Sequence, residues 1–547
     1  MDQNTAVRNI AIIAHVDHGK TTLVDQMFRQ SGAIERDDTD RIMDSMDLER
    51  ERGITIAAKN CSVIWDGVKI NILDTPGHAD FGGEVERALM MVDGAILLVD
   101  AAEGPLPQTR FVLSKALQAD LSIVVVINKI DRQDARPEEI LNQIYDLFID
   151  LDANDEQIDF PVLYAVGRDG TASTSLSERG SDLRPLLDTI LDQVSPPRFD
   201  GEAPFQMLVS NLGYSDYLGR LAIGRVVNGT VKTGDALSCI GKDAQAHPVK
   251  VSSLQVYQGL SFKEVDALRA GDIAILSGAD DVEIGDTICE RSNPKALPRV
   301  SVDEPTISMR FSVNTSPLAG TEGRFVQSTK LAERLYKETL HNVALRVIPS
   351  TVDESFTVQG RGEFQMAILL ESMRREGFEV SVGRPQIIFK QQGEQVLEPI
   401  EHLFIDCDEG YTGIVTEKRS LRKGRMVNLV NHGTGRVRLE FSIPSRGLIG
   451  YRSQFLTDTR GTGIMNALLE GYEPHRGDIA SRTTGSLVSD RAGETVPYAL
   501  FNLEPRGELC VGPGEKVYEG MIVGEHNRDN DLNVNPCKTK KLSNMRA

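Results

Sequence analysis

The stretch from Ile10 to Leu23 carries residues whose types and spacing suit the binding of phosphate groups. Ile10 to Ile13 predict a short buried strand, and from Lys20 onward the pattern becomes helical. A G-x-x-x-x-G-K-[ST] phosphate loop needs this order of strand, loop and helix, because its backbone N–H groups then converge at a helix N-terminus. Ala14 replaces the first glycine of the motif, which is acceptable if its φ stays negative. The alternative interpretation is an ordinary strand, turn and helix with a surface lysine.

Each residue type in this loop has an expected role. Lys20 would reach the terminal phosphates, and the Thr21 hydroxyl would bind Mg²⁺. Backbone N–H groups would hold the other phosphate oxygens. The predicted phosphate-binding residues are Asp17, His18, Gly19, Lys20, Thr21 and Thr22.

A second polar group, Asp74-Thr-Pro-Gly-His78, follows the predicted strand 70–73. Asp74 can hold Mg²⁺ through water, Gly77 can donate its N–H to a γ-phosphate, and His78 would face the attacking water. Taken alone, Asp-Thr-Pro-Gly would be a plain β-turn, but its place after a buried strand favours the phosphate site. Thr55, in the polar segment between the two groups, would contact the γ-phosphate and complete the Mg²⁺ shell. A loop that is ordered only by that phosphate is a switch.

Asn128-Lys-Ile-Asp131, directly after the predicted strand 123–127, decides which base is bound. The Asp131 carboxylate can accept both the ring N–H and the exocyclic amine of guanine, whereas adenine offers no such donor pair. Asn128 would support the loop, and Lys129 would cover the base with its aliphatic stem. The predicted base-binding residues are Asn128, Lys129, Ile130, Asp131, Val166 and Gly167. These motifs predict a domain that binds GTP and GDP with Mg²⁺.

The elements that must position these residues form a parallel sheet. Short apolar strands at 10–13, 70–73, 95–99, 123–127 and 162–165 alternate with amphipathic helices, and the motifs lie at the carboxyl ends of the strands. Pro196-Pro197 indicates a linker. Short strands with Gly-Asp turns at 234–235, 271–272 and 285–286 then predict an antiparallel barrel, and we interpret these Gly-Asp pairs as solvated turns. Helices are expected at 329–340 and 362–376.

Composition and charge exclude several classes of protein. With 547 residues the chain should hold several domains, and its longest apolar runs are far shorter than the roughly 18 residues of a membrane span. The six cysteines are scattered, which favours reduced thiols in a cytoplasmic protein over disulfides or a zinc site. The net charge of −20 argues against a general nucleic-acid coat, but residues 411–460 contain 10 basic and 3 acidic residues and could form a local basic face.

The motifs Ala-His-Val-Asp-His-Gly-Lys-Thr, Arg-Gly-Ile-Thr-Ile and Asp-Thr-Pro-Gly-His resemble those of the translational GTPases, the family of elongation factors G and Tu. The resemblance implies that His78 positions the hydrolytic water behind an apolar gate of Val16 and Ile54. It also implies weak intrinsic GTP hydrolysis that ribosomal RNA stimulates. One departure is Val166-Gly167, where related GTPases have Ser-Ala: Gly167 can still donate its N–H to guanine O6, but the serine hydroxyl is missing, and loop rigidity is then in doubt.

After the barrel, the domain order indicates which branch of the translational GTPases the chain resembles. Gly360-Arg-Gly-Glu363 resembles the third domain of elongation factor G, and from Pro399 the chain resembles its last domain, so the tip domain between them is missing. This order resembles the TypA (BipA) family, whose members associate with the ribosome and support large-subunit assembly and adaptation to stress or cold. The alternatives are a LepA-like elongation factor acting on translating ribosomes, a translocase, and a factor whose hydrolysis only times its release.

The expected fold is therefore multidomain α/β and β. It comprises a P-loop GTPase domain (1–199), a β-barrel (200–299), two ferredoxin-like α+β domains (300–390 and 391–480) and a β-rich C-terminal domain (481–547). That last domain is expected to be incomplete, because TypA-like chains run further. The expected partners are ribosomal RNA and ribosomal proteins, with tRNA left open, no membrane, and a monomer off the ribosome.

Clustered cations provide the candidates for RNA contact, because each phosphate contact adds a salt-dependent increment to affinity. The alternative is a solvated loop or helix face. The candidates are Lys418, Arg419, Arg422, Lys423, Arg425, Lys538, Lys540 and Lys541. Arg436, Arg438, Arg446 and Arg452 could extend this face or pair with acidic residues.

Overall fold

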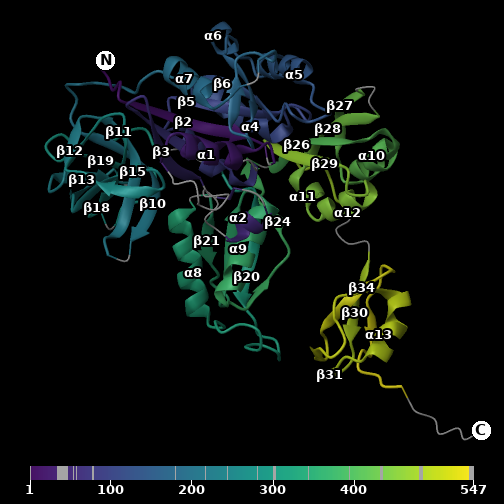
Figure 1. The fold of residues 1–547 in the computed structure, drawn as a ribbon. Helices are drawn as coiled ribbons and strands as arrows, with labels where there is room; N and C mark the ends of the chain where they lie inside the picture. The colour runs from purple at the N-terminus through teal and green to yellow at the C-terminus, as the bar shows by residue number, and fades with distance from the viewer. Residues whose placement is uncertain are drawn as a thin grey trace, which may run out of the picture.

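The computed structural model describes residues 2–540 except 16, 34–46, 53–54, 57, 77–78, 179, 216, 243, 280, 300–303, 343, 394, 432–434 and 480–483. Figure 1 shows the first domain at the top, the barrel at the left, the third domain below, the fourth domain at the right and the C-terminal domain at the lower right. The expected multidomain fold is confirmed.

The first domain is built on a seven-stranded sheet in the order β3-β4-β2-β5-β6-β7-β8. The inner strands are parallel and the edge strands β3 and β8 antiparallel. All five strands predicted from the sequence are present. The strands are β2 (Val7–Ala14), β3 (Lys59–Trp65), β4 (Val68–Asp74), β5 (Gly94–Asp100), β6 (Ser122–Asn128), β7 (Val162–Val166) and β8 (Thr171–Ser173). The helices are α1 (Lys20–Gln30), α2 (Asp47–Arg52), η1 (Ala79–Phe81), α3 (Gly82–Leu89), α4 (Pro107–Gln118), α5 (Pro137–Asp150), α6 (Asp155–Ile158) and α7 (Arg184–Gln193).

Both faces of this sheet are buried, which explains why its strands are almost wholly apolar. Successive residues of β2 belong to different cores, because side chains alternate along a strand: Ile10 and Ile12 pack on one face, Ala11 and Ile13 on the other. The carboxyl ends of the parallel strands therefore meet at one rigid edge, where the predicted motifs lie.

The second domain is the expected antiparallel barrel. Its eight-stranded sheet runs in the order β14-β13-β19-β10-β11-β18-β15-β16, with β12 paired to β17 beside it. The strands are β10 (Gln206–Ser215), β11 (Gly219–Asn228), β12 (Thr230–Lys232), β13 (Ala236–Ile240), β14 (Ala246–Lys250), β15 (Ser253–Gln258), β16 (Ser261–Glu264), β17 (Ala267–Arg269), β18 (Ile273–Ser277) and β19 (Thr287–Glu290). At the linker, β9 (Arg198–Phe199) pairs with β1 (Asp2–Gln3) at the start of the chain.

The interpretation of all three Gly-Asp pairs as solvated turns is wrong for two of them. Each glycine does have a positive φ, but Asp272 is only 8% exposed and Asp286 only 3%. Asp286 pairs with Arg299 at 2.8 Å. Asp272 binds the first domain: it lies 2.9 Å from Lys69 Nζ and accepts a hydrogen bond of 3.0 Å from the Asn71 amide. The spacing of glycines showed the turns but could not show what packs over them.

A buried polar network therefore joins the first domain to the barrel. The Asn71 amide also donates to Asn9 Oδ1, and the Asn9 amide donates to the Gly271 carbonyl. Nearby, Arg225 of the barrel pairs with Asp93 of the first domain at 2.6 Å. Such satisfied buried networks fix one relative orientation of two surfaces.

The third and fourth domains both have the β-α-β-β-α-β order and strand arrangement of ferredoxin-like folds. The third contains β20 (Ile307–Val313), α8 (Ser328–His341), β21 (Arg346–Pro349), β22 (Ser355–Gly360), α9 (Glu363–Glu376), β23 (Val380–Val382) and β24 (Gln386–Ile387). The fourth contains β25 (Lys390–Gln392), β26 (Gln395–Asp408), η2 (Glu409–Tyr411), α10 (Thr412–Leu421), β27 (Arg425–Asn431), β28 (Arg436–Pro444), α11 (Ser445–Leu448), α12 (Tyr451–Asp458) and β29 (Ile464–Pro474). The two helices predicted in the third domain, α8 and α9, are confirmed within one residue.

The C-terminal domain is β-rich, as expected, with a four-stranded sheet in the order β32-β34-β30-β35. Its elements are β30 (Gly485–Ser489), β31 (Gly493–Glu494), α13 (Pro497–Leu503), η3 (Glu504–Arg506), β32 (Gly507–Leu509), β33 (Lys516–Val517), β34 (Ile522–His526) and β35 (Leu532–Val534). Among the described residues of the whole chain, no helix has the length and apolarity that crossing a membrane requires.

The first, third and fourth domains meet around a cavity of about 300 Å³. Three carboxyl groups line it: Asp80 of η1, Glu363 of α9 and Glu401 of β26. Arg361 and Arg452 line it as well. Burial, helped by the charges of Asp80 and Glu363, raises the pKa of Glu401 to about 7, although the nearby Ser445 hydroxyl opposes the shift.

The stability of this junction should therefore fall as the pH rises. An unfolded glutamate titrates near about 4.3, so between that pH and about 7 the folded chain binds a proton that the unfolded chain has lost. We expect the parent to lose thermal stability from pH 5 to pH 8 and Glu401→Gln to lose much less. Thermal unfolding followed across this pH range tests the prediction. Glu508→Gln, at an exposed glutamate, is the matched control. If the unfolding temperatures of the parent and of Glu401→Gln change with pH in parallel, the prediction is wrong.

Candidate nucleotide site

The phosphate loop has the backbone shape that its sequence predicts. Ala14 is the last residue of β2, so its φ is negative as expected, while Asp17 and Gly19 have φ of 66° and 93°. Helix α1 begins at Lys20 with Gly19 as its N-cap. A Cβ at Gly19 would lie 2.6 Å from the Asn128 amide nitrogen, so only glycine permits both this φ and this contact. Free N–H groups at the start of α1 therefore face the loop, as phosphate binding requires.

Lys20 and Asp74 lie together at the end of the loop. Lys20 is 8% exposed, its Nζ is 2.8 Å from Asp74 Oδ1, and it donates to the Thr75 carbonyl. Asp74 is fully buried, and within the described part of the chain no hydrogen-bond donor reaches its Oδ2. A buried carboxylate oxygen without a donor fits a Mg²⁺ site, since this cation prefers oxygen ligands. Of the threonines predicted for the phosphates and the cation, Thr55 is buried, Thr21 is half-buried and Thr22 is exposed.

The base loop is joined to the phosphate loop through Asn128. Its amide donates to the His18 carbonyl at 2.9 Å, and its Oδ1 accepts the Gly167 N–H at 2.8 Å. Asn128 is 1% exposed, and these two hydrogen bonds place it between the two loops. The Gly167 N–H, predicted to be available for guanine O6, is thus already bonded and would have to be shared. Asp131 remains 39% exposed and accepts from Arg168 at 3.3 Å, while Ile130 packs against the core and Val166 is half-buried.

Helix α1 forms hydrogen bonds with the loop that lacks the serine. The Gln26 amide donates to the Arg168 carbonyl at 3.1 Å, and the Gln30 amide donates to the Gly170 carbonyl at 2.6 Å. Gln30 Oε1 also accepts the Leu183 N–H at 2.7 Å. These two glutamines lie one turn apart and hold the base loop against the helix that follows the phosphate loop.

Removing both amides should loosen the base loop. We expect Gln26→Ala with Gln30→Ala to bind GDP up to about 30-fold more weakly, because the two amide hydrogen bonds contribute about 1 kcal/mol each. The loss should lie mainly in faster release, measured with a fluorescent GDP analogue. Gln118→Ala is the control, because the Gln118 amide donates to Ser114 of its own helix. Equal GDP release from parent and double variant would contradict the assignment.

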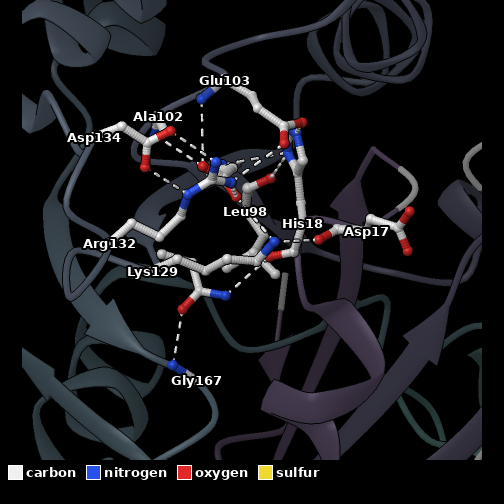
Figure 2. A network of polar contacts seen from close by, with 11 residues as sticks. Asp17, His18, Leu98, Ala102, Glu103, Lys129, Arg132, Asp134 and Gly167 are labelled. Carbon is white, nitrogen blue, oxygen red and sulfur yellow. Dashed lines mark hydrogen bonds and ion pairs between the residues drawn. The ribbon is translucent and has the colours of Figure 1, made fainter. Parts of the chain in front are cut away.

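Three residues outside the predicted set, Asp100, Glu103 and Arg132, complete the polar contacts, and Figure 2 labels Glu103 and Arg132 among them. Asp100 at the end of β5 contacts Lys129 and Arg132, and Arg132 also contacts Glu103, which lies 3.7 Å from His18 Nε2. Asp100 shared the signal of the other site residues, a polar residue directly after a buried strand. Arg132 and Glu103 carried no such signal.

Four predicted residues lie outside the described part of the chain. They are the catalytic candidate His78, Gly77, and the proposed gate residues Val16 and Ile54.

Helix α9 of the third domain contacts residues directly after the segment Asp74–His78 and residues of the polar segment that contains Thr55. Asp80 Oδ2 accepts the N–H groups of Phe364 at 3.0 Å and Gln365 at 3.3 Å, in the first turn of the helix. A Cβ at Gly362 would lie 2.1 Å from Asp80 Cγ, so glycine is needed for this approach.

Further contacts attach the same helix. Arg375 pairs with Glu51 of α2 at 2.8 Å, and Arg361, just before α9, pairs with Glu86 of α3 at 3.2 Å. A small apolar cluster lies between them. It comprises Leu48, Ile56, Phe81, Phe364 and Ile368.

Four family models match consecutive parts of the chain. They describe the elongation factor Tu GTP binding domain (residues 5–196), elongation factor Tu domain 2 (219–289), the elongation factor G C-terminus (395–483) and the TypA/BipA C-terminal domain (484–547). A Bacillus subtilis protein named large ribosomal subunit assembly factor BipA is 49% identical over 99% of this chain and 89% of its own length. The chain belongs to the TypA/BipA family of translational GTPases. It is a GTP hydrolase.

Other relatives agree with membership in the TypA/BipA family. Proteins of the same name from Escherichia coli K12 and Haemophilus influenzae are 49% and 48% identical over 99% of the chain, covering 90% and 88% of their own lengths. A solved structure from Thermus thermophilus has a TM-score of 0.61 at 17% identity, covering 86% of this chain and 98% of its own, and this likeness concerns the fold alone. The TypA/BipA interpretation is thus supported over the LepA-like alternative.

The structure corrects part of the predicted RNA-contact set. Arg419 is 0% exposed, with its guanidinium 2.8 Å above the centre of the Tyr451 ring, so its prediction as an RNA contact is wrong for this conformation. Lys418 is bound to both oxygens of Asp458 at 2.7 Å. Arg422 is half-buried and donates to the carbonyls of Gly447 and Ile449.

The remaining cations differ in how accessible they are. Lys423, Arg425, Lys538 and Lys540 are exposed, while Lys541 lies outside the described residues. Arg436 and Arg438 pair with Asp406, and Arg446 pairs with Glu398. These three arginines therefore pair with acidic residues, which was the alternative to extending the basic face. Arg452 is exposed.

Proposed function

We propose that this chain is a large ribosomal subunit assembly factor that acts as a GTP-dependent switch in the cytoplasm. The names of its relatives support this role. The observation that supports the switch is the attachment of helix α9 to α2, Ile56 and η1, which adjoin or belong to the two segments predicted to contact the γ-phosphate. A change in either segment alters the hydrogen bonds and apolar contacts that hold the third domain, so the nucleotide state becomes a change of domain position.

The proposed roles of the site residues follow from their positions. Backbone N–H groups of 17–22 and the Lys20 ammonium hold the phosphates, and Asn128, Lys129 and Asp131 hold guanine. Thr21, Thr55 and Asp74 would hold Mg²⁺, which neutralises charge on the phosphate oxygens. His78, behind the gate of Val16 and Ile54, would orient the attacking water, as the family implies.

On the ribosome the exposed cations provide phosphate contacts. Lys423 and Arg425 lie just before and at the start of the edge strand β27, and Lys538 and Lys540 lie near the end of the described chain. Their partners would be ribosomal RNA and, at the rim, ribosomal proteins, with the factor monomeric when free. Affinity through these contacts should weaken steeply with salt.

Ribosome co-sedimentation tests this proposal. Purified large subunits should retain the protein with a non-hydrolysable GTP analogue at higher salt than with GDP. Gly362→Ala should bind nucleotide normally but lose this difference, because a Cβ there displaces Asp80. Gly410→Ala, where a Cβ meets nothing within 4 Å, is the control. Binding that is equally strong in both nucleotide states would refute the switch.

A second measurement separates assembly from a role in each round of translation. A strain lacking the gene should accumulate large-subunit precursors at low temperature, seen in sucrose gradients. An assembly factor should hydrolyse about one GTP per binding event, whereas an elongation factor turns over many per ribosome. Normal subunit profiles with many turnovers per ribosome would refute the assembly role.

A further inference from the structure

Asp100 is a buried residue that contacts both the base loop and the phosphate loop. It is the last residue of β5 and is 0% exposed. Its Oδ1 accepts the N–H groups of Ala102 at 2.8 Å and Glu103 at 3.3 Å. Its Oδ2 lies 2.9 Å from Lys129 Nζ and 3.2 Å from an Arg132 nitrogen. Both oxygens of this carboxylate are therefore engaged by the protein itself.

The backbone of Lys129 has an unusual conformation, and its ammonium group has two partners. Its backbone has a positive φ of 58°, which is unfavourable for a lysine. Its Nζ donates to the Asp17 carbonyl at 2.5 Å as well as contacting Asp100. The ammonium thus ties the phosphate loop to β5 while the aliphatic stem stays beside the expected base position. Asp100 supplies the charge that keeps this ammonium, 31% exposed, from turning to solvent.

A second branch reaches the phosphate loop through Glu103. Arg132 bridges Asp100 and Glu103, and Glu103 Oε2 lies 3.7 Å from the ring of His18, whose Nδ1 faces the Asp100 N–H at 3.3 Å. Figure 2 shows the two branches converging, with Lys129 and Arg132 reaching in from the base loop. Removing the carboxylate would leave the Lys129 ammonium without its charge partner and beside the Arg132 guanidinium, which keeps its pairs with Glu103 and Asp134.

The charge of Asp100 is secure at neutral pH. Burial alone would raise the pKa of Asp100, but hydrogen bonds from Lys129 and the Ala102 N–H, with the charges of Lys129 and Arg132, lower it below its usual value.

We propose that Asp100 is a positioning residue for guanine-nucleotide binding, acting through Lys129 and Arg132 without touching the nucleotide. This inference rests on the proposed base site. It predicts equal losses for GDP and GTP, because the base and the loop backbone are common to both.

Titration of nucleotide-free protein with fluorescent GDP and GTP analogues tests the inference. Asp100→Asn should bind both about 10- to 100-fold more weakly, the loss typical when a supporting contact lets a binding group move. Lys129→Met should lose a similar amount, and the double variant should be no more than about threefold weaker than Lys129→Met, because both changes remove one linkage. Asp134→Asn is the matched control, since Asp134 also pairs with Arg132 but its side chain is 64% exposed.

Additive losses in the double variant, or an unchanged affinity in Asp100→Asn, would overturn the proposal. A purely structural role would lower the unfolding temperature without this non-additivity. If Asp100→Asn does not fold, Arg132→Met tests the second branch, because the Arg132 side chain is 34% exposed. We expect its nucleotide affinity to fall about 3- to 10-fold. Unchanged affinity would overturn the proposal. Failure of the base site itself would instead appear as normal GTP binding by Asp131→Asn.

Discussion

Asp131→Asn should lose GTP affinity by about 10³-fold and gain affinity for xanthosine triphosphate. The carboxylate can accept two guanine donors, whereas an asparagine would set its amide hydrogens against one of them. Xanthine has a carbonyl at that position and can accept from the amide. The exposed fraction of Asp131, 39%, leaves its acceptor face accessible to a base.

The measurement is a pair of titrations, GTP and xanthosine triphosphate, against parent and variant. Asp169→Asn is the control because Asp169 pairs with the same arginine, Arg168, and is also exposed. Full GTP affinity in Asp131→Asn would show that the base binds elsewhere. Loss of GTP without a gain of xanthosine triphosphate would indicate a collapsed loop.

His78→Ala should bind GTP almost normally but lose at least about 10³-fold of ribosome-stimulated hydrolysis. Positioning and preorganised charge contribute up to about 10⁵ in rate once an activator completes such a site. Phosphate release at saturating ribosomes measures this, with unstimulated hydrolysis recorded in parallel. His247→Ala, in strand β14 of the barrel, is the control. Stimulated hydrolysis at the parent rate would exclude a water-positioning role for His78.

The sequence predicted those parts of the site that are local in the chain. Ile10 to Ile13, Lys20 and Asn128 belong to motifs in which one short segment contains both strand and loop, so spacing alone places them. The ferredoxin-like domains were predictable for a different reason, because they came with the family resemblance.

The errors and omissions arose where distant segments meet. Asp272 and Arg419 were read as solvent-exposed, since nothing in their neighbourhoods shows that a β4 side chain or the Tyr451 ring packs over them. Gln26 and Gln30 looked like ordinary helix surface, because their partners lie about 140 residues away. Asp100 shared the signal of a polar residue after a buried strand, but its partners Lys129 and Arg132 could not be assigned without the fold.

The polar contacts between the first domain and the barrel also affect folding during synthesis. Asn71 and its partner Asp272 are separated by 201 residues, so at about 5–20 residues per second the acceptor follows the donor out of the ribosome by roughly 10–40 s. Until then the Asn9 and Asn71 amides, fully enclosed in the finished protein, must be solvated by water on an open sheet face. During synthesis, the first domain would therefore have a hydrated polar surface that is buried only when the barrel has folded against it. Slow translation between residues 71 and 272 would prolong the exposure of this surface to chaperones and proteases.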